Sequence, residues 1–167
     1  DNTPVHSIED GQIKIITNDR TSKGYGGLII IEHSIGKIIY YSLYGHLSDQ
    51  KKSVLKVGSF VKKGEKIGEI GAISENGGWS PHLHFQLMLT LLDYQNDFPG
   101  VCMENEKDIW SSICPDPFHI LNIEKIHNSK FDKTKLKNLR KKYLPNNLKL
   151  SYNEPIYIVR GFNQFLY

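Results

Sequence analysis

Two histidines separated by one residue, His82 and His84, carry the clearest chemical signal in this sequence. They lie in the run 81–89, whose apolar residues predict a β-strand. Because side chains alternate between the two faces of a strand, we expect both imidazoles on one face. Such a pair can hold one metal ion, or one ring can bind the metal while the other transfers a proton. Paired histidines also occur by chance on surfaces, so the interpretation depends on the motifs around them.

A third histidine, His46, follows an aromatic strand end and a glycine. Gly45 permits a sharp change of direction, so His46 could reach across a groove towards a neighbouring strand. A zinc hydrolase needs three protein ligands and an open position for water, and the three histidines could supply part of such a site. The remaining histidines are expected to be structural or surface residues: His6, His33, His119 and His127.

The elements that would position these histidines are short strands joined by turns. Runs of β-branched and aromatic residues predict strands at 13–17, 28–33 and 38–44, and the last two should pair as a hairpin. Glycines punctuate 57–71 and predict tight turns between short strands. Polar loops rich in glycine are expected at 18–27 and 71–81. The fold class is therefore predicted as mainly β, an antiparallel sheet or sandwich core with a short C-terminal helical appendage.

Residues 1–122 are predicted to form this β domain, and the chain changes character beyond it. Apolar residues recur at helical spacing among lysines between 133 and 144. Nine of the 21 Lys and Arg residues lie between 125 and 149, a pattern that could indicate nucleic acid. No aromatic residues interleave with them as in a base-stacking platform, so a solvated helix face or linker is favoured. We assign 123–146 to a basic helical linker and expect no nucleic-acid partner.

The composition is that of an ordinary soluble globular protein, with 39% hydrophobic and 23% charged residues. No stretch approaches the roughly 18 apolar residues that a membrane span needs, and no signal peptide is recognisable. Cys102 and Cys114 are not a CxxC pair, which argues against a cysteine-based zinc site. Whether they form a disulfide stays open, with reduced thiols the default in a cytosolic protein.

Three segments in order, 44–48 (Tyr-Gly-His-Leu-Ser), 61–68 and 77–85 (ending in His-Leu-His-Phe), resemble the motifs of the M23 zinc metallopeptidases. These are the lysostaphin- and LytM-type enzymes that cut peptide cross-links of bacterial peptidoglycan. Thr3-Pro4-Val5 followed by Asp10-Gly11 resembles the start of the family's β core. The resemblance covers about residues 1–90 and implies an antiparallel sheet with a groove across it.

The resemblance also implies roles for the three histidines. His84 corresponds to a zinc ligand, and His46 and His82 correspond to the catalytic histidines. The family's other two zinc ligands come from an HxxxD motif that would precede Asp1, and neither His6 nor Asp10 is a credible replacement. We therefore expect this chain to bind zinc weakly and to have little or no hydrolytic activity by itself.

Later segments resemble a particular set of fusion proteins. Residues 97–101 and 110–117 resemble the stretch that follows the M23 domain in proteins joining a kinase domain, an M23 domain and a class III aminotransferase. Residues 147–167 resemble the opening of that aminotransferase but lack its PLP lysine, so no PLP site is expected. An edge strand packing on the β domain is the alternative for this stretch. The fusion implies a cytoplasmic protein, whereas family membership alone would favour the cell envelope.

Three functions stay open at this point. The first is a zinc metalloendopeptidase domain acting on a peptide or a peptidoglycan-like substrate. The second is a non-catalytic M23-like module that binds a peptide or a partner through the same groove. The third is another metal-binding β-barrel such as a cupin, against which the Tyr-Gly-His and glycine-rich segments argue. The sequence does not decide the actual substrate or the oligomeric state.

Overall fold

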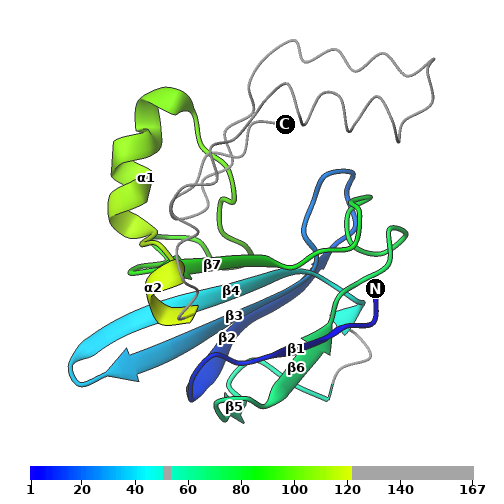
Figure 1. Cartoon of the computed structure of the whole chain (residues 1–167), viewed down its shortest axis with the longest axis horizontal. Coiled ribbons are helices and arrows are strands. Elements are labelled where there is room, and N and C mark those ends of the chain that lie inside the picture. The colour runs from blue at the N-terminus through cyan, green and yellow to red at the C-terminus, as the bar shows by residue number, and fades with distance from the viewer. Residues whose placement is uncertain (51–53, 122–167) are drawn as a thin grey trace, which may run out of the picture.

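The chain folds into two antiparallel sheets in the computed structural model, which describes residues 1–50 and 54–121 (Figure 1). The smaller sheet pairs β1 (Pro4–His6) with β6 (Lys66–Glu69). The larger sheet has the order β5-β2-β3-β4-β7. Its strands are β2 (Gly11–Asp19), β3 (Gly26–Ile35), β4 (Ile38–Leu47), β5 (Phe60–Val61) and β7 (His84–Met88). The prediction of a mainly β, antiparallel fold is confirmed.

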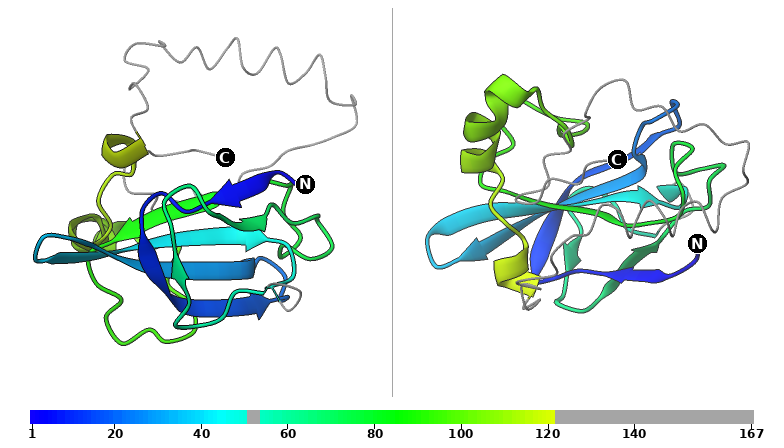
Figure 2. Two further views of the ribbon diagram at one scale, coloured as in Figure 1. Left: turned by 90° about the horizontal axis from the view of Figure 1, so that it is seen from below. Right: turned by 45° about the horizontal axis from the view of Figure 1, so that its top comes forward.

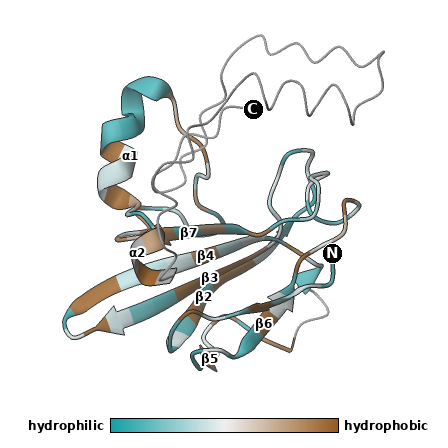
Figure 3. Cartoon of the chain, in the orientation of Figure 1, coloured by the Kyte–Doolittle hydropathy of each residue, from teal (hydrophilic) through white to brown (hydrophobic). Residues whose placement is uncertain are grey.

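The centre of the larger sheet is the predicted hairpin of β3 and β4. Ile35 pairs with Ile38, so only Gly36 and Lys37 form the loop. Gly36 has φ 61°, and a glycine with positive φ at the first loop position matches a type II′ turn, whose twist suits a hairpin. β3 is buried along Gly26–Ile31 because both faces of the sheet are covered, which explains its continuous apolar run (Figure 3).

Alternating residues of the strands feed two hydrophobic clusters, one on each face of the larger sheet. One cluster joins the larger sheet to the smaller one: Val5, Ile13, Ile29, Ile31, Tyr44, Leu47, Val61 and Ile67. The other joins the opposite face to the segment after β7: Ile15, Leu28, Ile30, Leu43, Met88, Phe98 and Cys114. The β1–β6 sheet and helix α1 (Lys107–Ile113) accordingly lie on opposite sides of the larger sheet (Figure 2).

Helical structure also occurs within residues 1–122, the segment assigned to the β domain. A 3₁₀ turn (Glu104–Glu106), α1 and α2 (Phe118–Leu121) follow β7. Trp110 and Ile113 of α1 pack against the second cluster, so tertiary packing supports a helix too short to show periodicity. No helix of the described residues is long and apolar enough to cross a membrane. The predicted helix at 133–144, the linker 123–146 and the segment 147–167 lie outside the described residues.

Both cysteines are free thiols in this structure. Cys102 is partly exposed, whereas Cys114 is buried at the end of α1. Burial raises the pKa of the Cys114 thiol, which keeps it protonated at neutral pH.

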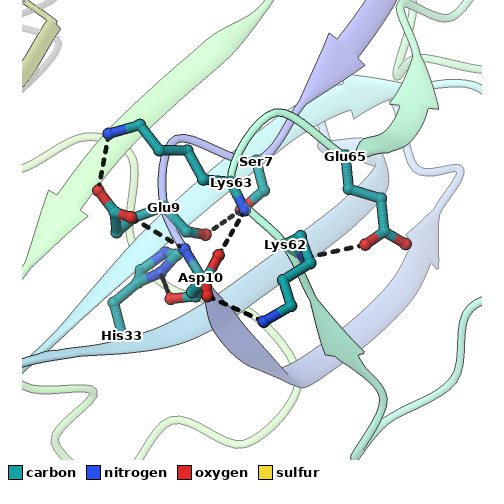
Figure 4. Close-up of polar contacts among 7 residues, drawn as sticks. All are labelled: Ser7, Glu9, Asp10, His33, Lys62, Lys63 and Glu65. Carbon is teal, nitrogen blue, oxygen red and sulfur yellow. Dashed lines mark hydrogen bonds and ion pairs between the residues drawn. The ribbon is translucent and has the colours of Figure 1, made fainter.

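The turn between β1 and β2 is fastened to the turn between β5 and β6 (Figure 4). The Asp10 carboxylate accepts hydrogen bonds from the backbone N–H of Lys63 (2.8 Å) and from Lys62 Nζ (3.2 Å). The backbone hydrogen bond from Lys63 is the main reason that the pKa of Asp10 is lowered. The Asp10 carbonyl also accepts from Nδ1 of the buried His33 (2.8 Å). His33 is therefore a structural residue, in line with the expectation from the sequence, and Asp10 fastens the two turns.

Candidate active site

The structure brings together the three histidines that the sequence singled out. The ring centroids of His46 and His82 lie 4.6 Å apart, and those of His46 and His84 lie 5.9 Å apart. His46 belongs to β4 and His84 to its neighbour β7, where Gly45 pairs directly with His84. The cluster therefore spans two adjacent strands at one end of the larger sheet.

His82 does not lie in the strand, contrary to the prediction for 81–89. β7 begins at His84, because its last pairing with β4 is at Gly45 and the regular ladder of β4 ends there. The His82 ring instead bonds its own local backbone, with Nδ1 2.6 Å from the carbonyl oxygen of Ser80. The expectation that His82 and His84 share one face of a strand is therefore wrong, although the ring of His82 lies against that of His46, with centroids 4.6 Å apart.

His46 occupies a β-bulge. Between the pairs Ile29–Tyr44 and Gly27–Leu47, β4 uses three steps where β3 uses two. His46 is in the left-handed region, with φ 62°. This conformation costs a residue with a side chain about 1–2 kcal/mol. It persists because the backbone is held on both sides: His46 N–H donates to the Tyr25 carbonyl (2.8 Å), and Gly71 N–H donates to the His46 carbonyl (2.9 Å).

Gly45 has a different role from the one predicted. It was expected to supply the change of direction, but the positive φ belongs to His46 and not to Gly45. What Gly45 supplies is space, because a Cβ at this position would lie 2.6 Å from Cδ1 of Tyr25. The missing side chain lets the Tyr25 ring lie against the histidine cluster.

Tyr25, within the predicted loop 18–27, is a further residue of the site. Its ring meets His84 edge-on at 5.1 Å and lies 5.9 Å from His46. The phenol donates to the carbonyl of Phe98 (2.8 Å), and burial raises its pKa well above the usual range. The Tyr25 phenol therefore stays uncharged at neutral pH, and its ring forms one side of the site. Its position between three glycines, Gly24, Gly26 and Gly27, was the available signal.

The loop 71–81 is built around Asn76, which is fully buried. Its side-chain amide donates to the carbonyls of Gly71 (3.1 Å) and Trp79 (2.9 Å) and accepts from Trp79 N–H (3.0 Å). The indole of Trp79 donates to the Gly24 carbonyl (3.1 Å), and its ring lies 5.7 Å from that of His46. Asn76 thus fixes the loop that carries Trp79 to the edge of the histidine cluster.

Backbone carbonyls set the proton positions of His46 and His82. Nδ1 of His46 lies 3.0 Å from the Asn76 carbonyl oxygen, and Nδ1 of His82 bonds the Ser80 carbonyl. A carbonyl oxygen only accepts, so each Nδ1 must donate. In the neutral rings the lone pair is therefore on Nε2. Two neighbouring imidazoles with Nε2 lone pairs can accept and return protons.

His84 differs from the other two histidines in its partner. Its Nε2 lies 3.2 Å from Oε1 of Gln86, and both side chains are buried. The described residues contain no group of three or more His, Cys, Asp or Glu side chains that could hold a metal ion. By themselves, then, they do not fit a zinc site, which normally takes three protein ligands. What they offer is one buried imidazole, His84, beside the rings of His46 and His82.

The model of peptidase family M23 matches residues 1–96, and the chain belongs to this family. It is 39% identical over 89 residues to an uncharacterized metalloprotease of Buchnera aphidicola subsp. Baizongia pistaciae, covering 52% of this chain and 20% of that protein. It is 35% identical over 86 residues to the peptidoglycan DD-endopeptidase ShyB of Vibrio cholerae, covering 52% and 18%. The chain thus spans about a fifth of the length of these relatives.

Among solved structures, the antimicrobial peptidase lysostaphin from Staphylococcus simulans is similar, with a TM-score of 0.46 and 27% identity. The match covers 79% of this chain and 47% of lysostaphin.

Proposed function

We propose that this chain carries the β domain of a zinc-dependent endopeptidase that cuts peptide bonds of the kind found in peptidoglycan cross-links. The observation that carries the proposal is the convergence of His46 and His82, whose ring centroids lie 4.6 Å apart and whose Nδ1 atoms both bond backbone carbonyls, beside the buried His84. Membership of family M23 and the similarity to a peptidoglycan DD-endopeptidase support the choice of substrate.

In this proposal each histidine has one role. His84 is the metal ligand, and a bound zinc ion would polarise the scissile carbonyl and make its water acidic. His46 and His82 handle protons through Nε2, one taking a proton from the attacking water and the other stabilising the oxyanion or protonating the leaving amine. Their Nδ1 hydrogen bonds to backbone carbonyls keep both rings oriented for this task.

The metal ligands give the sharpest test. Because the described residues hold no three-ligand group, we predict that the 167-residue chain retains little zinc and releases few fragments from peptidoglycan. The same chain preceded by an HxxxD segment should bind one zinc ion and become hydrolytic, and His84→Ala should remove the metal. Mass spectrometry measures the zinc content of each protein, and the release of soluble peptidoglycan fragments measures its hydrolytic activity. Stoichiometric, tightly held zinc in the 167-residue chain would overturn the ligand assignment.

A second candidate function is a non-catalytic module that binds a peptide or a partner at the same histidines. The absence of a three-ligand group from the described part of the chain favours it. Retention of all three histidines favours the enzyme, since binding alone does not require two proton carriers. Metal-independent binding of peptidoglycan fragments, with no hydrolysis by the HxxxD-preceded chain, would decide for the module.

We also propose that the parent protein is a fusion of a kinase domain, the M23 domain and a class III aminotransferase, located in the cytoplasm. The support is the resemblance of 97–101, 110–117 and 147–167 to segments of such fusions. Sequencing the parent transcript in both directions tests the fusion, and fractionation of cells tests the location. A secretion signal in the parent would contradict the cytoplasmic location.

A further inference from the structure

Gln86 connects His84 to the segments that follow β7. It lies two residues after His84 on the same face of β7 and is 1% exposed. Its side chain has three partners: Nε2 of His84 through Oε1 (3.2 Å), and the Pro99 carbonyl and Cys114 Sγ through Nε2 (3.2 Å each). Gln86 has no part in the mechanism proposed above, although it bonds the ring of the proposed ligand.

The orientation of the Gln86 amide follows from these partners. The Pro99 carbonyl oxygen can only accept, so the NH₂ end of the amide must point towards it. The Oε1 end must then point towards His84, and because Oε1 only accepts, Nε2 of His84 must carry a hydrogen. In the neutral ring of His84 the lone pair is therefore on Nδ1.

This arrangement is the opposite of that at His46 and His82, whose Nδ1 atoms are the donors. Within one cluster, the neutral rings of the two proposed proton carriers have their lone pair on Nε2, whereas the neutral ring of the proposed ligand has its lone pair on Nδ1. The difference comes from the type of acceptor that the fold provides: backbone carbonyls for the first two, a buried side-chain amide for the third.

The surroundings confine the His84 ring in this orientation. A Cβ on Gly100 would lie 2.9 Å from Cε1 of His84, so the chain passes close to the ring. Phe98 and Pro99 supply consecutive carbonyls, one to the Tyr25 phenol and one to the Gln86 amide. Both of these side chains touch His84. The segment 98–100 therefore contacts both Tyr25 and Gln86, and it also passes close to the His84 ring.

We propose that Gln86 is a positioning residue that fixes the tautomer of His84, so that Nδ1 is the nitrogen through which His84 acts. The assignment of zinc as the group bound by Nδ1 rests on the proposed function, whereas the tautomer of His84 does not depend on it. A buried ligand histidine that donates its other N–H to a fixed acceptor is oriented and made more basic by it. With the amide reversed, NH₂ would face Nε2 of His84 and the lone pair would move to that atom.

The test is a long-range ¹H–¹⁵N spectrum of the metal-free 167-residue chain at about pH 9, where ordinary imidazoles are neutral. We expect His84 to show one tautomer, with the hydrogen on Nε2 and slow exchange of that hydrogen with water. Gln86→Leu removes the acceptor, so exchange should become fast and the Nδ1–H form should become detectable. Gln86→Glu keeps an acceptor and should keep the wild-type tautomer.

Two further variants serve as controls. Cys114→Ala should leave the His84 signals unchanged, because the Pro99 carbonyl alone orients the amide. Gln12→Leu alters a strand glutamine that donates to the Gly58 carbonyl on the surface, and should also have no effect on His84. A wild-type spectrum with the hydrogen on Nδ1 would overturn the inference even if Gln86→Leu failed to fold. So would a folded Gln86→Leu with unchanged exchange at Nε2.

Zinc titration of the chain preceded by an HxxxD segment, which the proposed function expects to bind zinc, separates this inference from the proposed function. If His84 is a ligand, added zinc shifts the Nδ1 resonance, and Gln86→Leu should weaken that binding by roughly 10- to 100-fold. No zinc-dependent shift at Nδ1, together with the expected tautomer, would count against the metal role and leave the role of Gln86 standing. A shift at Nε2 would contradict the inference about Gln86.

Discussion

The rings of His46 and His82 lie 4.6 Å apart, although one belongs to a bulge in β4 and the other precedes β7. Each is held through Nδ1 by a carbonyl oxygen of the loop 71–81, Asn76 for His46 and Ser80 for His82. One loop therefore orients both of the proposed proton carriers, and changes in that loop should affect them together.

The first prediction concerns turnover. In the chain preceded by an HxxxD segment, His46→Ala and His82→Ala should each lower peptidoglycan hydrolysis by about 10²- to 10⁴-fold, the usual contribution of a positioned acid or base. Zinc content should stay the same, because neither residue is a proposed ligand. His6→Ala, which changes an exposed residue of β1, is the control. Unchanged turnover in either site variant would remove the proposed role of that histidine.

The second prediction concerns the strain at His46. Because His46 has φ 62°, glycine should be tolerated there better than alanine. His46→Gly should be more stable than His46→Ala by about 1–2 kcal/mol in urea unfolding, although both lack the imidazole. Equal stability of the two variants would show that the backbone relaxes out of the left-handed region once the ring is removed.

The third prediction uses the buried amide of Asn76. Asn76→Asp keeps the shape of the side chain but places carboxylate oxygens against the carbonyls of Gly71 and Trp79, which only accept. The expected cost is about 1–3 kcal/mol or more, because buried donors are replaced by a charged acceptor. Asn18→Asp is the matched control, since Asn18 only accepts, from Gln50 N–H (2.7 Å). Similar melting temperatures for the two variants would contradict this reading.

The fourth prediction concerns stability against pH. Burial is the main cause that lowers the pKa of His33 in the folded chain. The unfolded chain, with an ordinary histidine pKa of about 6.5, then binds a proton more readily than the folded chain. Stability should therefore fall as the pH drops below about 6.5, and the loss should end below the lowered pKa of the folded state. Protonation would also disturb Nε2, which accepts from the Ser42 hydroxyl at 2.7 Å.

Urea unfolding at several pH values between 7.5 and 5 measures this effect, about one unit either side of the ordinary histidine pKa. His33→Gln cannot titrate and should show a shallower loss of stability over this range. The same slope in both proteins would mean that other groups cause the pH dependence.

The sequence predicted the parts of the site that depend on strand patterns and short motifs. The hairpin of β3 and β4 and the gathering of His46, His82 and His84 are of this kind. The bulge at His46 was missed because it depends on register between β3 and β4, which no local pattern reports. Tyr25, Asn76 and Gln86 were missed because their partners lie far along the chain or are backbone carbonyls, which every residue carries.

The segment 98–100 has a practical consequence for anyone who wishes to move this domain into another protein. The family match ends at residue 96, but the carbonyls that hold Tyr25 and Gln86 belong to Phe98 and Pro99. Cys114, at the end of α1, completes the surroundings of the same amide. A domain cut at the end of the family match would keep all three histidines but would lose the carbonyls that hold Tyr25 and Gln86 against His84. The smallest portable unit of this site therefore extends beyond the family match, at least through Pro99.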